Sequence, residues 1–299
     1  MSKKYKKILI ANRGEIAIRI ARTCREMGIE TVSVHSLEDE NSLHVKMADE
    51  SVCIGPAASK DSYLNIHAVL SAADITGAEA IHPGYGFLSE NAGFAKACEQ
   101  MNIDFIGPSA EIIKNLGDKI RSKALAIEAC VPVLDPINVD EPNFLLQVLD
   151  LGFPVIIKAS AGGGGRGMRI VEKEEELVST IKILKKESLA AFGDDTLFAE
   201  KYIRNPRHVE VQILGDKFSN IIHLGERDCT VQRRFQKIIE EAPSQILSEE
   251  AREAIWSSAI KIGRHVGYDS VGTVEFLFDL DSGKHYFMEM NTRIQVEHP

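Results

Sequence analysis

The chain has 299 residues, of which 44% are hydrophobic and 26% charged, a composition typical of a soluble globular protein with a sizeable core. Two domains are expected at this length. The formal net charge of −9 argues against a nucleic-acid-binding protein, which would present a basic face, and no apolar run approaches the ~18 residues that a membrane span needs.

The cysteines indicate a reducing compartment. They are odd in number, far apart and without a Cys-x-x-Cys pair: Cys24, Cys53, Cys98, Cys130 and Cys229. We therefore expect neither a disulfide framework nor a zinc site. The lysine-rich N-terminus leads straight into an apolar strand, which is not the pattern of a secretory signal. These features predict a cytoplasmic protein.

The first third of the chain predicts alternating strands and helices. Strands are expected at residues 7–11, 31–35, 51–54, 78–82 and 104–106, and helices at residues 15–27, 63–73 and 91–101. Continuous apolar strands between helices indicate a parallel sheet covered on both faces. The first turn lacks the Gly-x-Gly-x-x-Gly of dinucleotide-binding proteins, so this Rossmann-like domain is not expected to hold NAD.

A Pro/Gly-rich loop at residues 82–91 follows a predicted strand. It lies at the carboxyl end of that strand, where ligands gather in open α/β sheets. A rigid turn with Ser89 capping the next helix explains the same residues. From spacing alone the second interpretation is favoured.

The middle of the chain carries a glycine-rich loop. Residues 109–130 predict a helix, and the three prolines that follow indicate a connection between domains. The strand predicted at residues 153–160 carries Lys158, and a lysine there needs a partner if it is buried. The loop at residues 161–168 leads into another strand, which excludes the dinucleotide and Walker A patterns.

Strand, glycine loop and strand is the arrangement that protein kinases lay over ATP phosphates. Glycines let backbone N–H groups approach phosphate oxygens without side-chain clash. The alternative is a hinge without a ligand, in which consecutive glycines are costly to order.

The next segment predicts an antiparallel sheet. A helix is expected at residues 173–191, and strands at residues 196–203, 207–214 and 220–225 follow without helices between them. In the second strand His208, Glu210 and Gln212 share one face. The charged residues 226–241 indicate a solvated surface or a source of cations for phosphate. Ser248 is expected to cap a helix at residues 249–266.

The most informative stretch is an acidic hairpin predicted at residues 271–299. Two aromatic-rich runs flank an Asp-Ser-Gly turn, and centring the hairpin on that turn places Glu275 opposite Glu289. Facing carboxylates repel unless a cation lies between them. Asn291 and Arg293 follow at spacings of two, so the wall offers ligands for Mg²⁺ and a guanidinium for an oxyanion. The alternative is a surface hairpin with solvated acids.

Together these pieces resemble biotin carboxylase, the ATP-grasp component of biotin-dependent carboxylases. The resemblance is carried, in order, by residues 10–17, 81–91, 158–168, 200–202, 205–210, 232–237 and 289–299. It implies an α/β fold with a Rossmann-like parallel-sheet domain at residues 1–113. An ATP-grasp α+β domain would follow at residues 114–299, with an antiparallel sheet and a mobile glycine-rich lid at about residues 132–203.

The resemblance also assigns site residues. For ATP it implies phosphate contacts from Lys119, Lys158, Gly164 and Gly165, adenine contacts from Glu200, Lys201 and Ile203, and ribose contacts from His208 and Gln232. For two Mg²⁺ (or Mn²⁺) ions, and through them for ATP, it implies Glu275, Glu289 and Asn291. For bicarbonate it implies Lys237, Arg293, Gln295, Val296 and Glu297, and for biotin Tyr85 and Gly86.

The implied reaction has two stages. Bicarbonate attacks the γ-phosphate of ATP to give carboxyphosphate and ADP, and a biotin ureido nitrogen is then carboxylated. Glu297 suits a base for bicarbonate, while Arg293 and Lys237 suit an anion site. The implied partners are a biotin carboxyl carrier domain or protein and a carboxyltransferase component, and the full-length protein is expected to form a homodimer.

Three features depart from the family pattern. Phe235 stands where a histidine is usual near the nucleotide, and Ala161 replaces the first of five glycines. The sequence also stops at Pro299, before the rest of the ATP-grasp fold, which suggests a fragment. The alternatives are another ATP-grasp ligase, such as a carbamoyl-phosphate or purine-pathway enzyme, and a non-catalytic nucleotide-binding fragment.

Overall fold

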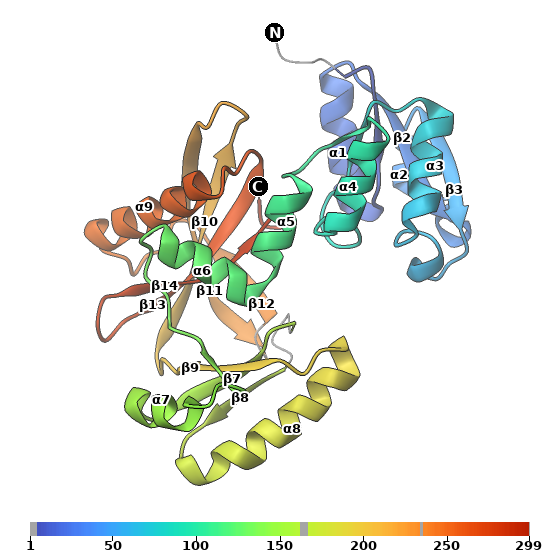
Figure 1. Ribbon diagram of the computed structural model, residues 1–299. Helices are drawn as coiled ribbons and strands as arrows, with labels where there is room; N and C mark the ends of the chain where they lie inside the picture. The colour runs from blue at the N-terminus through green and yellow to red at the C-terminus, as the bar shows by residue number, and fades with distance from the viewer. Residues whose placement is uncertain (1–4, 162–166, 234–235, 299) are drawn as a thin grey trace.

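The protein consists of an N-terminal domain, a central sheet with its helices, and a lid (Figure 1). The computed structural model describes residues 5–161, 167–233 and 236–298. No helix within these ranges combines the length and hydropathy that crossing a bilayer requires. All five cysteines are free thiols.

The N-terminal domain is built on a parallel sheet with the strand order β3-β2-β1-β4-β5. Its strands are β1 (Lys7–Ile10), β2 (Glu30–Ser36), β3 (Glu50–Gly55), β4 (Ala80–His82) and β5 (Asp104–Phe105). Its helices are α1 (Gly14–Glu26), α2 (Leu43–Met47), α3 (Ile66–Thr76) and α4 (Ala92–Gln100).

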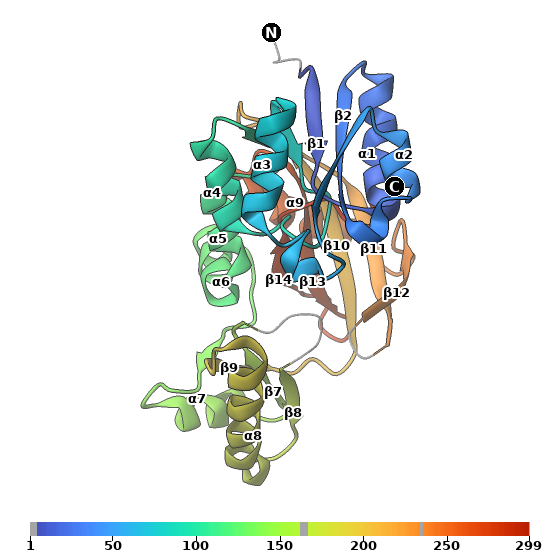
Figure 2. The same ribbon diagram turned by 90° about the vertical axis from the view of Figure 1, so that its right-hand side faces the viewer.

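Helices cover both faces of this sheet, as predicted (Figure 2). Ile8 and Ile10 of β1 pack with α1 on one face, whereas Leu9 joins the cluster of α3 and α4 on the other. This split follows from the alternation of side chains along a strand. The strand order reverses between β1 and β4, so the loops after these two strands meet at the point where ligands bind in such sheets.

Two helix starts differ from the prediction because asparagines cap them. Asn65 accepts a hydrogen bond from the backbone N–H of Ala68, so α3 begins at Ile66 rather than at residue 63. Asn91, and not Ser89, caps α4, because its side chain accepts from Phe94 N at 2.9 Å. Helix α2 was not predicted.

The helix predicted at residues 109–130 is two helices, α5 (Ala110–Gly117) and α6 (Lys119–Glu128). Asp118 lies between them in an extended conformation, and its carboxylate accepts hydrogen bonds from Ile120 N and Arg121 N at 2.9 Å each. A capping aspartate thus starts a new helix inside a continuous helical pattern.

The lid has a core of its own around a four-stranded sheet with the order β6-β9-β7-β8. Its elements are β6 (Ile137–Asn138), α7 (Phe144–Leu151), β7 (Val155–Ala159), β8 (Met168–Val171), α8 (Glu174–Phe192) and β9 (Leu197–Lys201). The strands on either side of the glycine loop pair antiparallel, with Lys158 opposite Met168. This confirms the predicted strand–loop–strand arrangement.

The central sheet is antiparallel, as predicted, with the order β12-β11-β10-β13-β14. The strand predicted at residues 196–203 is not part of it, because β9 pairs within the lid. Its elements are β10 (Pro206–Gly215), β11 (Ile221–Arg233), β12 (Gln236–Glu241), α9 (Glu249–His265), β13 (Val271–Asp279) and β14 (His285–Asn291). Ser248 caps α9 by accepting from Ala251 N, also as predicted.

The charged segment at residues 226–241 is a solvated surface only in its second part, where most residues of β12 are exposed. Strand β11 continues through its first part, and Glu226 and Arg227 are only 3% and 8% exposed. Charge density alone does not reveal burial, because each of these groups is paired inside the protein.

Candidate functional site

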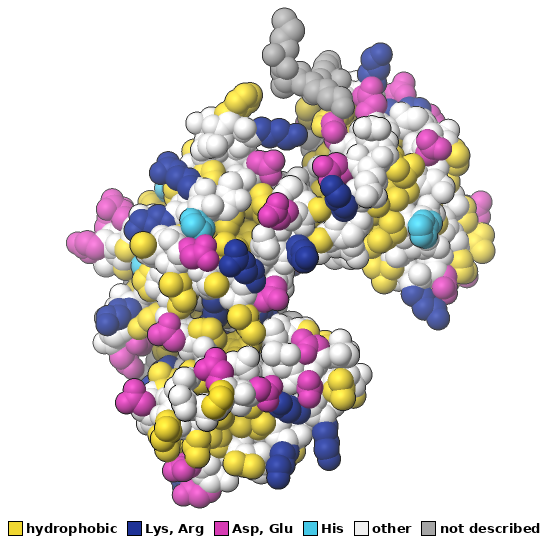
Figure 3. Space-filling model, viewed as in Figure 1, with side chains coloured by type: hydrophobic (Ala, Val, Ile, Leu, Met, Phe, Trp, Pro, Cys, Tyr) yellow, Lys and Arg dark blue, Asp and Glu magenta, His cyan; other side chains and the backbone are white. Residues whose placement is uncertain are grey.

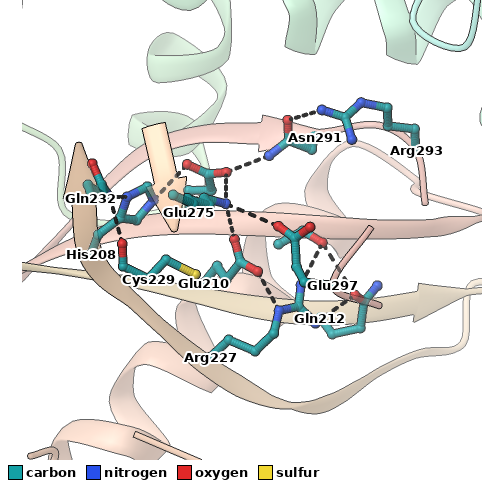
Figure 4. A network of polar contacts seen from close by, with 12 residues as sticks. His208, Glu210, Gln212, Arg227, Cys229, Gln232, Glu275, Asn291, Arg293 and Glu297 are labelled. Carbon is teal, nitrogen blue, oxygen red and sulfur yellow. Dashed lines mark hydrogen bonds and ion pairs between the residues drawn. The ribbon is translucent and has the colours of Figure 1, made fainter. Parts of the chain in front are cut away.

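One face of the central sheet is apolar and the other is polar. Along β10, Val209, Val211 and Ile213 join the hydrophobic core with α9. The alternate residues Glu210 and Gln212 point to the opposite face, where both are buried. In the sheet Glu210 lies opposite Glu275 on one side and Arg227 on the other. The polar face therefore concentrates charges (Figure 4).

Buried cations hold these acids in place. Arg227 Nε and Lys237 Nζ both donate to the Glu210 carboxylate, which is fully buried. Lys237 Nζ also lies 2.9 Å from Glu275 Oε1 and 3.5 Å from Glu297 Oε1. Burial by itself would lower the pKa of Lys237, but Glu275 and Glu210 raise it above the ordinary value. Lys237 is thus a permanent cation surrounded by three carboxylates.

The acidic hairpin pairs Glu275 with Glu289, as predicted. Near the turn the register differs from the prediction, because Phe276 faces Phe287. A bulge between the two pairs restores the expected match at the glutamates. The spacing had suggested that the strand continues to Arg293. Strand β14 instead ends at Asn291, so Arg293 lies beyond it.

The pKa values of the two facing glutamates are shifted in opposite directions. Glu275 accepts hydrogen bonds from Asn291 Nδ2 at 2.6 Å and Lys237 Nζ, and its Oε2 lies 2.7 Å from His208 Nε2. Burial would raise the pKa of Glu275, but His208 and Lys237 outweigh it and hold the pKa well below its usual range. At Glu289 burial and the charge of Glu275 raise the pKa.

A divalent cation fits this wall. Lys119 Nζ, the cation paired with Glu289, is 3.7 Å from its carboxylate, too far for a hydrogen bond. Within the described ranges no group of three or more His, Cys, Asp or Glu side chains is arranged as a metal site. Glu275, Glu289 and Asn291 would thus supply only part of a coordination shell. Mg²⁺ commonly takes one or two carboxylates and completes its shell with water and phosphate oxygens.

Arg293 is held by a residue that the sequence did not reveal. Its Nε donates to Glu90 Oε2 at 2.8 Å, and its second amino group contacts Asn291 Oδ1 at 3.2 Å. Glu90 also accepts from Thr292 N at 3.2 Å. Glu90 belongs to the N-terminal loop at residues 82–91, so one carboxylate joins that loop to the end of the hairpin. A separation of 203 positions in sequence gave no local signal for this pair.

The N-terminal loop at residues 82–91 is held by hydrogen bonds from Asn12, which follows β1. Asn12 Nδ2 donates to the carbonyl oxygens of Pro83 and Tyr85 at 2.7 and 2.8 Å. Gly84 has a φ of +64°, and a Cβ there would lie 2.9 Å from Asn12 Nδ2. The close approach therefore requires glycine. Burial lowers the pKa of His82, at the start of the loop, to about 4.

Residues of the acidic hairpin, the N-terminal loop, the lid and α6 line one cavity of about 830 Å³. Among the predicted residues, those on its wall are Tyr85, Gly86, Lys119, Lys158, Glu200, His208, Gln232, Lys237, Glu275, Glu289, Asn291, Arg293, Gln295, Val296 and Glu297. The wall combines the N-terminal domain, the lid and the central sheet, and the surface is hollowed between that domain and the lid (Figure 3).

A smaller and more apolar cavity of about 390 Å³ adjoins the first, and Lys158, His208 and Gln232 line both. It contains the other two described residues of the prediction, Lys201 and Ile203. The Lys201 ammonium donates to the carbonyl oxygens of Leu151 and Gly152, so its charge is used within the lid. Gly164, Gly165, Phe235 and Pro299 lie outside the described residues.

The sequence missed a second buried cluster in the large cavity. Glu200 is fully buried, and its two carboxylate oxygens are paired with Lys123 and Lys158. Both oxygens of its side chain are thus used by lysines, so the adenine contact predicted for Glu200 would come from its backbone. The available signal was the position of Lys123, four residues after Lys119 and on the same helix face. Arg227 gave no comparable signal inside its charged segment.

Both parts of the chain match known families. Residues 4–113 match the family described as biotin carboxylase, N-terminal domain. Residues 118–299 match the family described as carbamoyl-phosphate synthase L chain, ATP binding domain.

Several curated proteins are similar over nearly the whole chain. Biotin carboxylase 1 of Bacillus subtilis (strain 168) is 54% identical over 299 residues, with 98% of this chain and 66% of that protein covered. The mitochondrial propionyl-CoA carboxylase alpha chain of Homo sapiens is 52% identical over 301 residues, with 99% of this chain and 41% of that protein covered. The chain thus spans about two thirds of the length of the bacterial relative.

Solved structures agree in fold. A biotin carboxylase–beta-gamma-ATP complex from Campylobacter jejuni has a TM-score of 0.94 at 50% identity, covering 99% of this chain and 67% of that one. The biotin carboxylase domain dimer of Hydrogenobacter thermophilus 2-oxoglutarate carboxylase, in complex with MgADP, ADP and bicarbonate, has a TM-score of 0.93 at 50% identity. It covers 99% of this chain and 66% of that one.

Proposed function

This chain belongs to the biotin carboxylase family, and we propose that it forms the nucleotide, cation and bicarbonate sites of an enzyme that uses ATP to carboxylate biotin. The observation that carries the proposal is the single cavity in which the lid, the acidic hairpin and the N-terminal loop meet. A relative that is 50% identical was solved with MgADP and bicarbonate. We place the boundary between the two domains at residue 113.

The nucleotide would lie between the lid and the hairpin. Lys119 and Lys158 line the large cavity and would bind phosphates as point charges. The base would occupy the apolar cavity beside Ile203, with His208 and Gln232 at the ribose between the two cavities. We retain Gly164 and Gly165 as phosphate contacts from the loop above.

Glu275, Glu289 and Asn291 would hold the divalent cation, Mg²⁺ or Mn²⁺. When bound, the ion would neutralise charge that develops on phosphate oxygens during phosphoryl transfer. The raised pKa of Glu289 supports this assignment, because the repulsion from Glu275 that contributes to it is relieved by a cation.

Bicarbonate would bind among Lys237, Arg293, Gln295, Val296 and Glu297. Glu297 would accept the bicarbonate proton while a bicarbonate oxygen attacks the γ-phosphorus. The bond from that phosphorus to the bridging oxygen breaks, which gives carboxyphosphate and ADP. Lys237 stays charged and would stabilise the anions, and Arg293 would orient them through its guanidinium fork.

In the second stage carboxyphosphate would transfer its carboxyl group to a ureido nitrogen of biotin. The bond between the carboxyl carbon and the phosphate oxygen breaks, and the released phosphate would take the proton of that nitrogen. Tyr85 and Gly86 would form the edge of the biotin site. The biotin would be carried by a carboxyl carrier domain or protein, and a carboxyltransferase component would receive the carboxyl group. The biotin carboxylase domain of the H. thermophilus relative is a dimer, and we propose that this protein also forms a homodimer. We propose the cytoplasm as its location, on the basis of the free thiols.

The test is release of ADP from ATP that depends on bicarbonate, measured on this chain and on the protein extended to the length of its bacterial relatives. We expect bicarbonate to stimulate the extended protein, and free biotin to stimulate it further. No stimulation by bicarbonate, with or without biotin, would refute the proposal. Stimulation by an amine instead would favour another ATP-grasp ligase.

A further inference from the structure

Helix α6 carries two lysines, one turn apart, that line the large cavity and have different partners. Lys119 lies near Glu289 on the hairpin, whereas Lys123 contacts Glu200 in the lid. Lys123 is only 4% exposed. A buried ammonium is unfavourable unless it is ion-paired or hydrogen-bonded. The functions proposed above give Lys123 no role.

Lys123 donates hydrogen bonds to residues near both ends of the lid segment. Its Nζ donates to the carbonyl oxygen of Leu134 at 3.0 Å and to Glu200 Oε1. Leu134 lies in the segment that enters the lid, and Glu200 is one residue from the end of β9, where the chain leaves it. Because α6 belongs to the core of the central sheet through Leu125 and Ala126, Lys123 fixes the base of the lid to that core.

The carboxylate of Glu200 is shared between two lysines. Its Oε2 lies 2.8 Å from Lys158 Nζ on the neighbouring strand β7. Lys158 faces Phe198 in the pairing of β7 with β9, so it is the diagonal neighbour of Glu200 on the same face. These three side chains carry one more positive than negative charge, and an anionic ligand would balance it. Asp135 also acts on Lys123, and Glu289 on Lys158, without a direct ion pair.

We propose that Lys123 is a positioning residue for nucleotide binding, which keeps Glu200 ion-paired when the Lys158 ammonium leaves that carboxylate to bind phosphate. The inference rests on the proposed nucleotide site. Without Lys123, the buried Glu200 would have Lys158 as its remaining lysine partner among the described residues. Separating a buried carboxylate from its last cation is strongly unfavourable, so Lys158 would stay at Glu200 and be lost to the phosphates.

The experiment measures the dissociation constant of MgADP by titration calorimetry for the 299-residue chain and its variants. We expect Lys123→Met to weaken binding by about tenfold or more. The double variant Lys123→Met/Glu200→Gln should regain affinity to within about threefold of the wild type, because a neutral glutamine no longer holds Lys158. A merely structural role for Lys123 predicts the opposite, since the two substitutions would then add.

Two controls accompany these variants. Lys123→Arg keeps the charge and should bind MgADP within about threefold of the wild type. Lys186→Met removes an exposed lysine of α8 in the same lid and should have no effect. If Lys123→Met does not fold, Lys123→Gln takes its place, since an amide can donate a hydrogen bond without carrying a charge, and the same loss of affinity is expected.

The results separate this inference from the proposed function. A wild-type chain that binds MgADP, with no loss in the single variant or an equal loss in the double variant, would overturn the role of Lys123 and leave the nucleotide site standing. A wild-type chain that does not bind MgADP would overturn the proposed function, and this inference with it.

Discussion

The two faces of the central sheet come from the same strands but are stabilised in different ways. On one face Val211 and Phe276 are fully buried against α9, and hydrophobic packing accounts for the arrangement. On the other face Glu210 and Glu275 are also buried, but each is held by cations from neighbouring elements. The side chains of the apolar face have their packing partners within the protein. The polar face keeps two glutamates whose charges repel each other, and a bound cation would reduce that repulsion.

The largest expected effect comes from the polar face alone. Glu297→Gln removes the proposed base, so bicarbonate-dependent release of ADP by the extended protein should fall by about 10²- to 10⁴-fold. The free energy of unfolding of the chain should change by less than about 1 kcal/mol, because the side chain is at the cavity and not in the core. Full activity in this variant would contradict the proposed chemistry.

The apolar face should show the converse. Phe276→Ala removes a fully buried ring, and the free energy of unfolding should fall by about 3–5 kcal/mol in denaturant titrations. Phe218→Ala is the matched control, since that ring is 85% exposed, and its effect should stay within about 0.5 kcal/mol. Equal effects at the two positions would mean that the faces do not differ as described.

The smallest effect concerns Glu289. Its pKa is raised in the folded state by burial and by Glu275. Ionised Glu289 therefore destabilises the folded protein at a pH above its folded-state pKa. At a pH below its unfolded-state pKa the group is protonated in both states and has no such effect. Glu289→Gln should therefore stabilise the ligand-free chain at pH 7, by a few tenths to about 1 kcal/mol after allowance for solvent screening. The gain should disappear as the pH falls through the folded pKa. A loss of stability at pH 7 would contradict the repulsion between the two glutamates.

The sequence predicted most of the fold because its periodicities are strong. The parallel sheet, the strand–loop–strand of the lid and the capped helix α9 follow from local patterns that the structure confirms. The division at Asp118 was missed because a capping aspartate within a helical pattern does not by itself interrupt it. The strand predicted at residues 220–225 was shorter than β11, because paired charges cannot be distinguished from solvated charges in a sequence.

The site was predictable where its residues lie on one hairpin or one motif. Glu275 and Glu289 face each other as predicted, although a bulge was needed to bring them into register. Glu90 and Lys123 were missed because their partners are distant in sequence. Arg227 was missed because the predicted strand ended before it, so its pairing with Glu210 across β10 and β11 was not considered. A partner fixed only by tertiary packing leaves no spacing to recognise.

The central claim is that the polar face binds a nucleotide together with a divalent cation at Glu275, Glu289 and Asn291. The most direct test is the dissociation constant of ADP for this chain with Mg²⁺ and with EDTA, in the wild type and in Glu289→Gln. The account predicts binding that is about tenfold or more tighter with Mg²⁺ in the wild type, and a dependence on Mg²⁺ that is largely lost in the variant. Equal affinity with and without Mg²⁺ in both proteins would contradict it.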